Sequence, residues 1–159
     1  MRARFTSCIT LLLALLCAPA DARSPELKVV AVNATFDDVR ENVEDAILKR
    51  GFVIDYTAYI GNMLNRTAKD VGATRRIYDK ALTVQFCSSV LSRRMMEADP
   101  ANIGFCPYVV FLYTLEGQPS TTYVGYRNLP LSDLPAERAA IEAVGSMLEA
   151  IAREAAGTR

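Results

Sequence analysis

The sequence predicts an α+β fold in which one largely antiparallel sheet has helices packed on one face, with a long C-terminal helix. Three observations lead to this prediction. Short β-branched segments alternate with amphipathic segments of helical period through the first hundred residues. Two later strand-like segments, 108–115 and 121–127, are separated only by a turn, which favours a hairpin. The chain then ends in one long amphipathic segment at 133–157.

The first strand and the first helix adjoin each other. Residues 27–34 (LKVVAVNA) form a short β-branched run typical of a strand. Thr35 offers a hydroxyl as N-cap, and Asp38, three residues later, makes an aspartate variant of the capping box. Gly51 suits the position just after a helix. The predicted buried stripe of this helix consists of Phe36, Val39, Val43, Ala46 and Ile47.

The middle of the chain adds two strands and two helices. Apolar and polar residues alternate over 52–58, the period of a half-buried strand. Residues 62–71 have helical spacing and are followed by a polar loop. A third strand is predicted at 80–87, and a helix at 88–99 that Pro100 stops.

The C-terminal third supplies the hairpin and the longest helix. Residues 108–115 (YVVFLYTL) are nearly all apolar, which indicates a central strand, and 121–127 return as the fifth strand. Asp133 and Pro135 open the last helix, as first-turn residues commonly do. Its predicted apolar stripe consists of Ile141, Val144, Leu148, Ile151 and Ala155.

The N-terminus has the pattern of a secretory signal peptide. Two arginines precede an apolar run at 5–16, and small residues follow it. Cleavage is expected after Ala22, with Ala20 as the alternative, so the mature domain is 23–159. The apolar run is shorter than the roughly 20 residues that a membrane-spanning helix needs. We therefore expect a periplasmic protein without a membrane span.

Composition excludes several classes of activity. The 159 residues contain 18 Lys and Arg, 18 Asp and Glu, and no His. A neutral chain lacks the surplus of cations that nucleic-acid binding uses, so no nucleic-acid partner is expected. Without imidazole there is no Ser-His or Cys-His pair and no His-ligated metal. No carboxylate pair suggests acid–base catalysis, so an enzyme is the less favoured class, with no cofactor and no catalytic residue assigned.

Two cysteines remain once the leader is removed, and they carry the main functional hypothesis. Cys87 ends one predicted strand and Cys106 begins the next, so antiparallel pairing would place both sulfurs at one end of the sheet. Export to an oxidising compartment favours a disulfide. Such a bridge would close a loop of about 20 residues and stabilise the fold by roughly 3 kcal/mol.

Three other interpretations of the thiols stay open. They are buried free thiols, a reversible redox pair, or a Cu(I) site that also uses Met95 or Met96, because soft sulfur ligands suit this cation. The run CPY at 106–108 resembles the start of the Cys-Pro-Tyr-Cys motif of glutaredoxins, but Val109 replaces the second cysteine. The predicted strand after it also differs from the helix N-terminus that activates such thiols.

A ligand surface is predicted around the cysteines. Arginine side chains offer planar forks for an anion, although solvated faces explain them more simply. Tyrosines on the two hairpin strands suggest an aromatic surface or cross-strand packing. The exposed hairpin edge or the last helix leaves a homodimer as a further possibility. The candidate binding residues are Met63, Arg66, Thr67, Arg93, Arg94, Met96, Pro107, Tyr108 and Arg127.

Four stretches of this chain resemble the domain-of-unknown-function family 302. They are TFDDVRENVEDAILKRGF, IGNMLNRTAKDVG, FCSSVLSRRMMEADPANIGFCPYVVFLY and YVGYR, and the resemblance covers about 27–128. It implies a TATA-binding-protein-like fold of the order strand, helix, four strands, helix, with 62–71 as an insertion. The family carries no agreed activity, so the resemblance implies a fold and no mechanism.

These observations together predict an exported, non-enzymatic binding or accessory protein of unknown ligand, stabilised by a Cys87–Cys106 disulfide. The alternative is a periplasmic thiol redox, sulfur-transfer or Cu(I)-binding protein that uses the same two cysteines.

Overall fold

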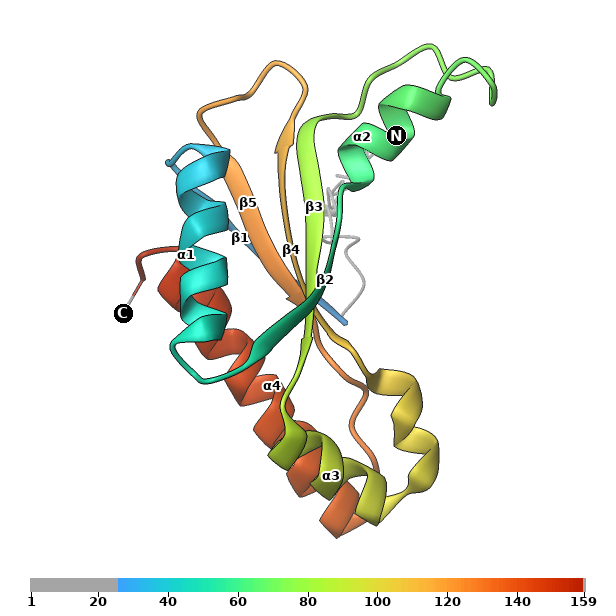
Figure 1. Ribbon diagram of the computed structural model, residues 1–159, viewed down its shortest axis with the longest axis vertical. Coiled ribbons are helices and arrows are strands. Elements are labelled where there is room, and N and C mark those ends of the chain that lie inside the picture. The colour runs from blue at the N-terminus through green and yellow to red at the C-terminus, as the bar shows by residue number, and fades with distance from the viewer. Residues whose placement is uncertain (1–25, 159) are drawn as a thin grey trace, which may run out of the picture.

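The computed structural model describes residues 26–158, so the predicted leader at 1–22 lies outside the described residues. Figure 1 shows the arrangement of the helices and strands. In chain order the elements are β1 (Leu27–Val32), α1 (Phe36–Leu48), β2 (Val53–Ala58), α2 (Ile60–Thr67), β3 (Tyr78–Cys87), α3 (Ser89–Ala98), the 3-10 helix η1 (Pro100–Phe105), β4 (Tyr108–Leu115), β5 (Thr122–Arg127) and α4 (Pro135–Ala155).

The five strands form one sheet in the order β1-β5-β4-β3-β2, and every neighbouring pair is antiparallel. The predicted α+β class, the antiparallel sheet and the long C-terminal helix are therefore confirmed. β4 and β5 form the expected hairpin, with Tyr113 opposite Tyr123. The first two strands of the chain occupy the two outer edges of the sheet.

One face of the sheet carries the hydrophobic core. Alternate residues of β4 (Tyr108, Val110, Leu112 and Thr114) are buried on this face, as the strand period requires. α1 and α4 pack across it, and α3 packs against α4 at the end of the sheet (Figure 1). α4 contributes a stripe of seven buried residues: Ala140, Ile141, Val144, Leu148, Ile151, Ala152 and Ala155.

The start of α1 follows the capping interaction predicted from sequence. The Thr35 hydroxyl accepts a hydrogen bond from the Asp38 backbone N–H at 3.2 Å, and its own proton goes to the Asp38 carboxylate at 2.7 Å. These bonds satisfy a backbone donor that the first helical turn leaves without an intrahelical partner. All five residues of the predicted stripe are buried. This helix is therefore fixed by local sequence and by its apolar face together.

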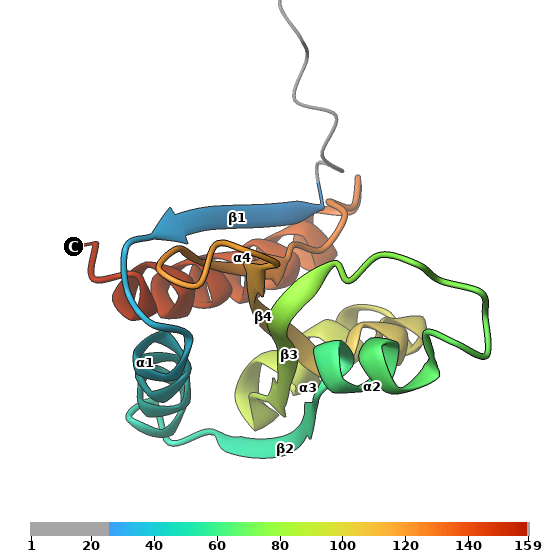
Figure 2. The same cartoon turned by 90° about the horizontal axis from the view of Figure 1, so that it is seen from above.

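Residues 26–158 cover the opposite face of the sheet only in part. α2 lies against β3 on this face, where Gly61 fits closely over Ala81. Figure 2 shows α1 and α2 on opposite sides of β3. The fold thus refines the prediction of helices on one face, because α1, α3 and α4 cover one side while the short α2 borders the other.

Two local features differ from the sequence-based expectations. Residues 100–105 form η1, a single 3-10 segment that has too few residues to show a helical period. The helix predicted at 62–71 begins earlier and ends earlier, as α2. Within residues 26–158, no helix is both long and apolar enough to span a membrane.

Candidate functional site

The two cysteines meet at one end of the sheet, as the sequence predicted for antiparallel neighbours. Cys87 is the last residue of β3 and Cys106 precedes β4 by two residues. The pairing of Phe86 with Tyr108 places them side by side. Both are partly exposed, and neither forms a disulfide in this structure.

Three further side chains surround the thiols. Ser92 Oγ lies 3.2 Å from Cys106 Sγ and 3.0 Å from the Tyr108 hydroxyl. That hydroxyl also donates to Met95 Sδ at 3.6 Å. Ser92 and Met95 project from α3, and both are buried together with Tyr108. We call these five residues, Cys87, Ser92, Met95, Cys106 and Tyr108, the sulfur cluster.

Burial governs the protonation of this cluster. Desolvation, and secondarily the hydrogen bond with Cys106, raises the pKa of Cys87 to about 11. Desolvation also raises the pKa of Tyr108 to about 12. At neutral pH only about one Cys87 in ten thousand is a thiolate, since each pH unit below the pKa lowers that fraction tenfold. Cys87 therefore lacks the lowered pKa of an activated nucleophile.

Only part of the predicted ligand surface gathers around the sulfur cluster. Tyr108 is a member of the cluster, and Pro107 adjoins it through a cis peptide bond to Cys106. Arg93 is exposed and forms an ion pair with Glu97 at 3.6 Å. Arg94 points to a shallow cleft between α3 and α4. Met96 is half-buried on α3 beside the cluster residue Met95.

The remaining predicted residues lie elsewhere. Met63, Arg66 and Thr67 are on α2, which packs near Ala81 of β3. Cys87 lies six residue steps along β3 from Ala81, a span of about 20 Å at the usual rise of a strand. Arg127 is exposed at the end of β5. The structure therefore does not bring the α2 residues to the cysteines.

The uncovered side of the sheet, which we call the open face, carries a second candidate site. Strand alternation places Phe111, Tyr113 and Leu115 of β4 there, and register adds Tyr123 of β5. The rings stack in parallel, with centroids 6.5 Å apart for Phe111 and Tyr113 and 4.8 Å apart for Tyr113 and Tyr123. Tyr78 completes the group at 5.3 Å from Tyr113. The open face thus presents a continuous aromatic surface.

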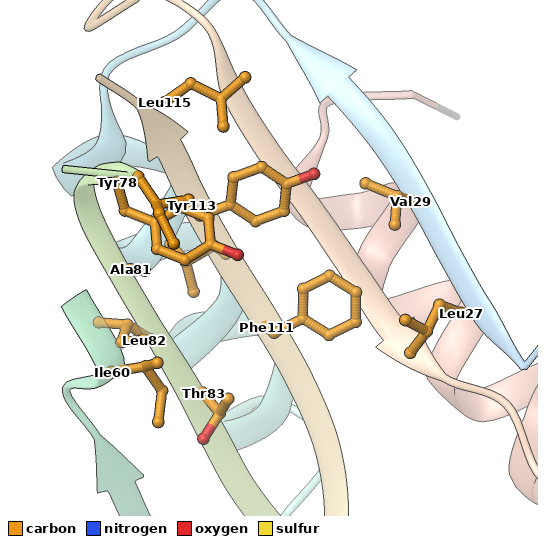
Figure 3. Close-up of a pocket in the computed structure, with 12 residues that line it drawn as sticks. Leu27, Val29, Ile60, Tyr78, Ala81, Leu82, Thr83, Phe111, Tyr113 and Leu115 are labelled. Carbon is orange, nitrogen blue, oxygen red and sulfur yellow. The ribbon is translucent and has the colours of Figure 1, made fainter. Parts of the chain in front are cut away.

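A groove of about 450 Å³ runs over this surface between β1 and α2 (Figure 3). This volume lies within the usual range for small-molecule sites. None of its lining residues is charged, and the polar groups are the hydroxyls of Tyr78, Thr83 and Tyr113. The lining residues are Leu27, Val29, Ile60, Ile77, Tyr78, Ala81, Leu82, Thr83, Phe111, Leu112, Tyr113 and Leu115.

Two glycines allow the groove to form. A Cβ at Gly61 would lie 2.9 Å from the backbone nitrogen of Ala81, so glycine lets α2 approach β3 closely enough to act as a wall. A Cβ at Gly125 would lie 2.7 Å from Phe111 Cζ, so glycine lets this ring lie flat on the sheet. The groove depends on these close approaches.

The sequence indicated part of this surface. Of the four tyrosines considered on the hairpin strands, Tyr113 and Tyr123 lie on the open face, while Tyr108 and Tyr126 face the core. The sequence signal for this surface was the nearly all-apolar run at 108–115. It indicates a strand with apolar side chains on both faces of the sheet. The contribution of β1 and α2 could not be inferred locally, since both are distant in sequence.

Sulfur atoms are the metal-binding groups that this arrangement offers. Across residues 26–158, no three His, Cys, Asp or Glu side chains cluster in a way that could hold a metal ion. The sulfur cluster instead combines two thiols with one thioether, a donor set that suits soft cations.

The structure is that of a small α+β domain with an antiparallel five-stranded sheet and a long C-terminal helix. Residues 28–155 match the family described as Domain of unknown function DUF302. The chain belongs to this family. The match extends beyond the predicted stretch of 27–128 and takes in α4.

A solved structure confirms the fold. The chain is similar to an uncharacterized conserved DUF302 protein from Bacillus stearothermophilus, with a TM-score of 0.67 and 15% sequence identity. The similarity covers 83% of this chain and 99% of that chain. At this identity the likeness concerns the fold alone. No curated protein matches this chain.

Proposed function

We propose that this protein is a non-enzymatic binding protein that holds a small, uncharged, ring-bearing molecule in the groove of the open face. The observation that supports this proposal is the stack of Phe111, Tyr113 and Tyr123 on a sheet face that the core helices leave uncovered. Aromatic rings favour offset stacking with another flat ring, which adds about 1 kcal/mol to the burial of its area.

The lining determines the chemistry of the ligand. A charged group placed among these side chains would lose its hydration without gaining a partner of opposite charge, which is costly. A neutral ligand avoids this cost, and the hydroxyls of Tyr78 and Thr83 can orient one polar substituent. The lining provides hydroxyls but neither a carboxylate nor a cysteine, so binding fits it better than catalysis.

A fluorescent probe tests the groove. The neutral dye N-phenyl-1-naphthylamine should bind the protein saturably, with one site per chain. Val29→Trp should weaken this binding by at least about tenfold, because an indole on β1 fills the volume that a ring-bearing ligand requires. Val53→Trp is the matched control, since Val53 is 71% exposed on β2 and is not a lining residue.

The result of the control decides the interpretation. Unchanged binding by Val53→Trp together with weakened binding by Val29→Trp supports the groove. Equal binding by both variants, or no saturable binding by the folded wild-type protein, would show that the groove is not a ligand site. Circular dichroism of both variants confirms that the sheet is retained.

Export and a Cys87–Cys106 bridge form the second part of the proposal. The leader pattern at 1–22 supports export, and the position of both cysteines at the same end of paired β3 and β4 supports bridge formation after export. We expect both sulfurs to be blocked when protein from the exported fraction is alkylated under denaturing conditions before reduction, and both to react after reduction. Mass spectrometry provides the count, and two reactive thiols before reduction would contradict the bridge.

A further inference from the structure

Three sulfur-bearing side chains from three elements of the fold gather at one end of the sheet. Cys87 comes from the end of β3, Cys106 from the segment before β4, and Met95 from α3. The pairing of Phe86 with Tyr108 brings Cys87 and Cys106 to the same end of the sheet, and Cys106 and Met95 are joined through Ser92 and the Tyr108 hydroxyl by contacts of 3.2, 3.0 and 3.6 Å.

We propose that the reduced protein binds one Cu(I) ion through the sulfurs of Cys87, Cys106 and Met95. This site is separate from the groove, because it lies at the far end of β3 from α2. Thiolates and thioethers are the soft ligands that Cu(I) prefers, and the ion needs no imidazole. The donor set therefore suits this cation better than Mg²⁺ or Ca²⁺, which take oxygen ligands.

The binding step is an exchange of protons for metal. Cu(I) replaces the proton of each thiol, so two Cu–S bonds form, two S–H bonds break and two protons pass to solvent. No electron is transferred. Met95 adds a neutral donor. Because two thiolates bind one singly charged copper ion, the complex carries one net negative charge. Ser92 stabilises that charge by donating its hydroxyl proton to Cys106.

Met95 can become a ligand without unfolding α3. Its Sδ accepts the Tyr108 proton in this structure, but that hydroxyl also lies 3.0 Å from Ser92 Oγ. Tyr108 can therefore donate to Ser92 while Ser92 donates to Cys106, which frees the thioether. Both buried hydroxyls keep a partner in this arrangement, as their burial requires.

Metal binding and bridge formation are alternative fates of the same two sulfurs. When a disulfide forms, the two thiols give up two electrons and two protons to an oxidised thiol compound. Neither sulfur is then available as a thiolate ligand. The test must therefore start from protein that has been reduced and then freed of reductant under anaerobic conditions.

Competition titration with the Cu(I) chelator bicinchoninate measures the binding. The wild-type protein should remove one equivalent of Cu(I) from the chelator, and native mass spectrometry should show one bound copper per chain. Cys87→Ser and Cys106→Ser should each remove this competition. Affinity should rise at least about tenfold per pH unit between pH 6 and 8, because Cys87 must lose its proton to bind.

The thioether is tested by a matched pair of variants. Met95→Leu keeps the shape of the side chain but lacks sulfur, and it should weaken Cu(I) binding by about tenfold. Met147→Leu is the control, because Met147 packs against the core on α4, outside the sulfur cluster. It should bind as the wild type does.

The outcomes separate the parts of the proposal. Failure of the folded, reduced wild-type protein to compete for Cu(I) would overturn the site. Equal affinity of Met95→Leu and Met147→Leu would overturn the role of Met95. Binding of the dye in the groove is measured on the same samples, so a failed copper site and a failed groove are distinguishable.

Discussion

Gly125→Ala is expected to destabilise the protein by about 3 kcal/mol, the upper range for overpacking a close contact. The added methyl group would overlap the carbonyl oxygen of Lys28 and approach Phe111 Cζ at 2.7 Å. The oxygen belongs to the paired backbone of β1, so it cannot move without breaking the pairing of β1 with β5. The Phe111 ring must also lift from the sheet, which disturbs the floor of the groove.

Urea unfolding measures this effect, and Gly104→Ala serves as its control. A Cβ at Gly104 would meet no atom within 4 Å, and this residue does not have positive φ. We therefore expect the control to change stability by less than about 0.5 kcal/mol. A Gly125→Ala variant as stable as the control would mean that β1 is not held as described. Dye binding should also weaken in the Gly125→Ala variant.

Phe86→Ala is expected to cost about 4 kcal/mol, as typical for removing a buried phenylalanine. Phe86 is fully buried on β3, next to Cys87. Its ring stacks on Phe52 at 5.7 Å and meets the edge of Tyr108 at 6.1 Å. The variant leaves a cavity between these rings, and it removes the packing that holds Tyr108 in contact with Ser92 and Met95.

Two variants define the scale for Phe86. Phe86→Leu retains most of the volume and should be less destabilising than Phe86→Ala. Tyr56→Ala removes an aromatic side chain that is 62% exposed on β2, and should cost less than about 1 kcal/mol. A loss for Phe86→Ala no larger than that for Tyr56→Ala, measured by urea unfolding, would argue against the described core.

Local sequence determined most of the elements. The cap of α1 at Thr35 is encoded within four residues, and the stripe of α4 repeats over about four turns, so both were predictable. The hairpin of β4 and β5 was predictable because its strands are neighbours in the chain. η1 was not, because Asp99 caps it by accepting from the Ala101 N–H, a single contact without periodicity.

The candidate sites depended on contacts that local sequence does not encode. The approach of the two cysteines followed from a single assumption, the antiparallel pairing of two strands, and was therefore predicted. The groove requires β1, β4 and α2 to meet, and this depends on the glycine contacts at Ala81 and Phe111. Arg66 was also expected near the cysteines, but no strand pairing links α2 to that end of the sheet. Met95 and not Met96 belongs to the sulfur cluster, because the side of α3 that carries Met95 faces Tyr108.

The order of the strands also has a consequence for how the chain is made. β1 leaves the ribosome first, but its partner β5 is among the last elements to be synthesised, and β2 must wait for β3. β1 therefore has no strand to pair with until residue 127 has emerged, whereas β2 can pair once Cys87 has emerged. β4 and β5 have the shortest connection in the sheet, and short loops cost less entropy to close. The β1 edge of the sheet consequently stays incomplete until synthesis is nearly finished.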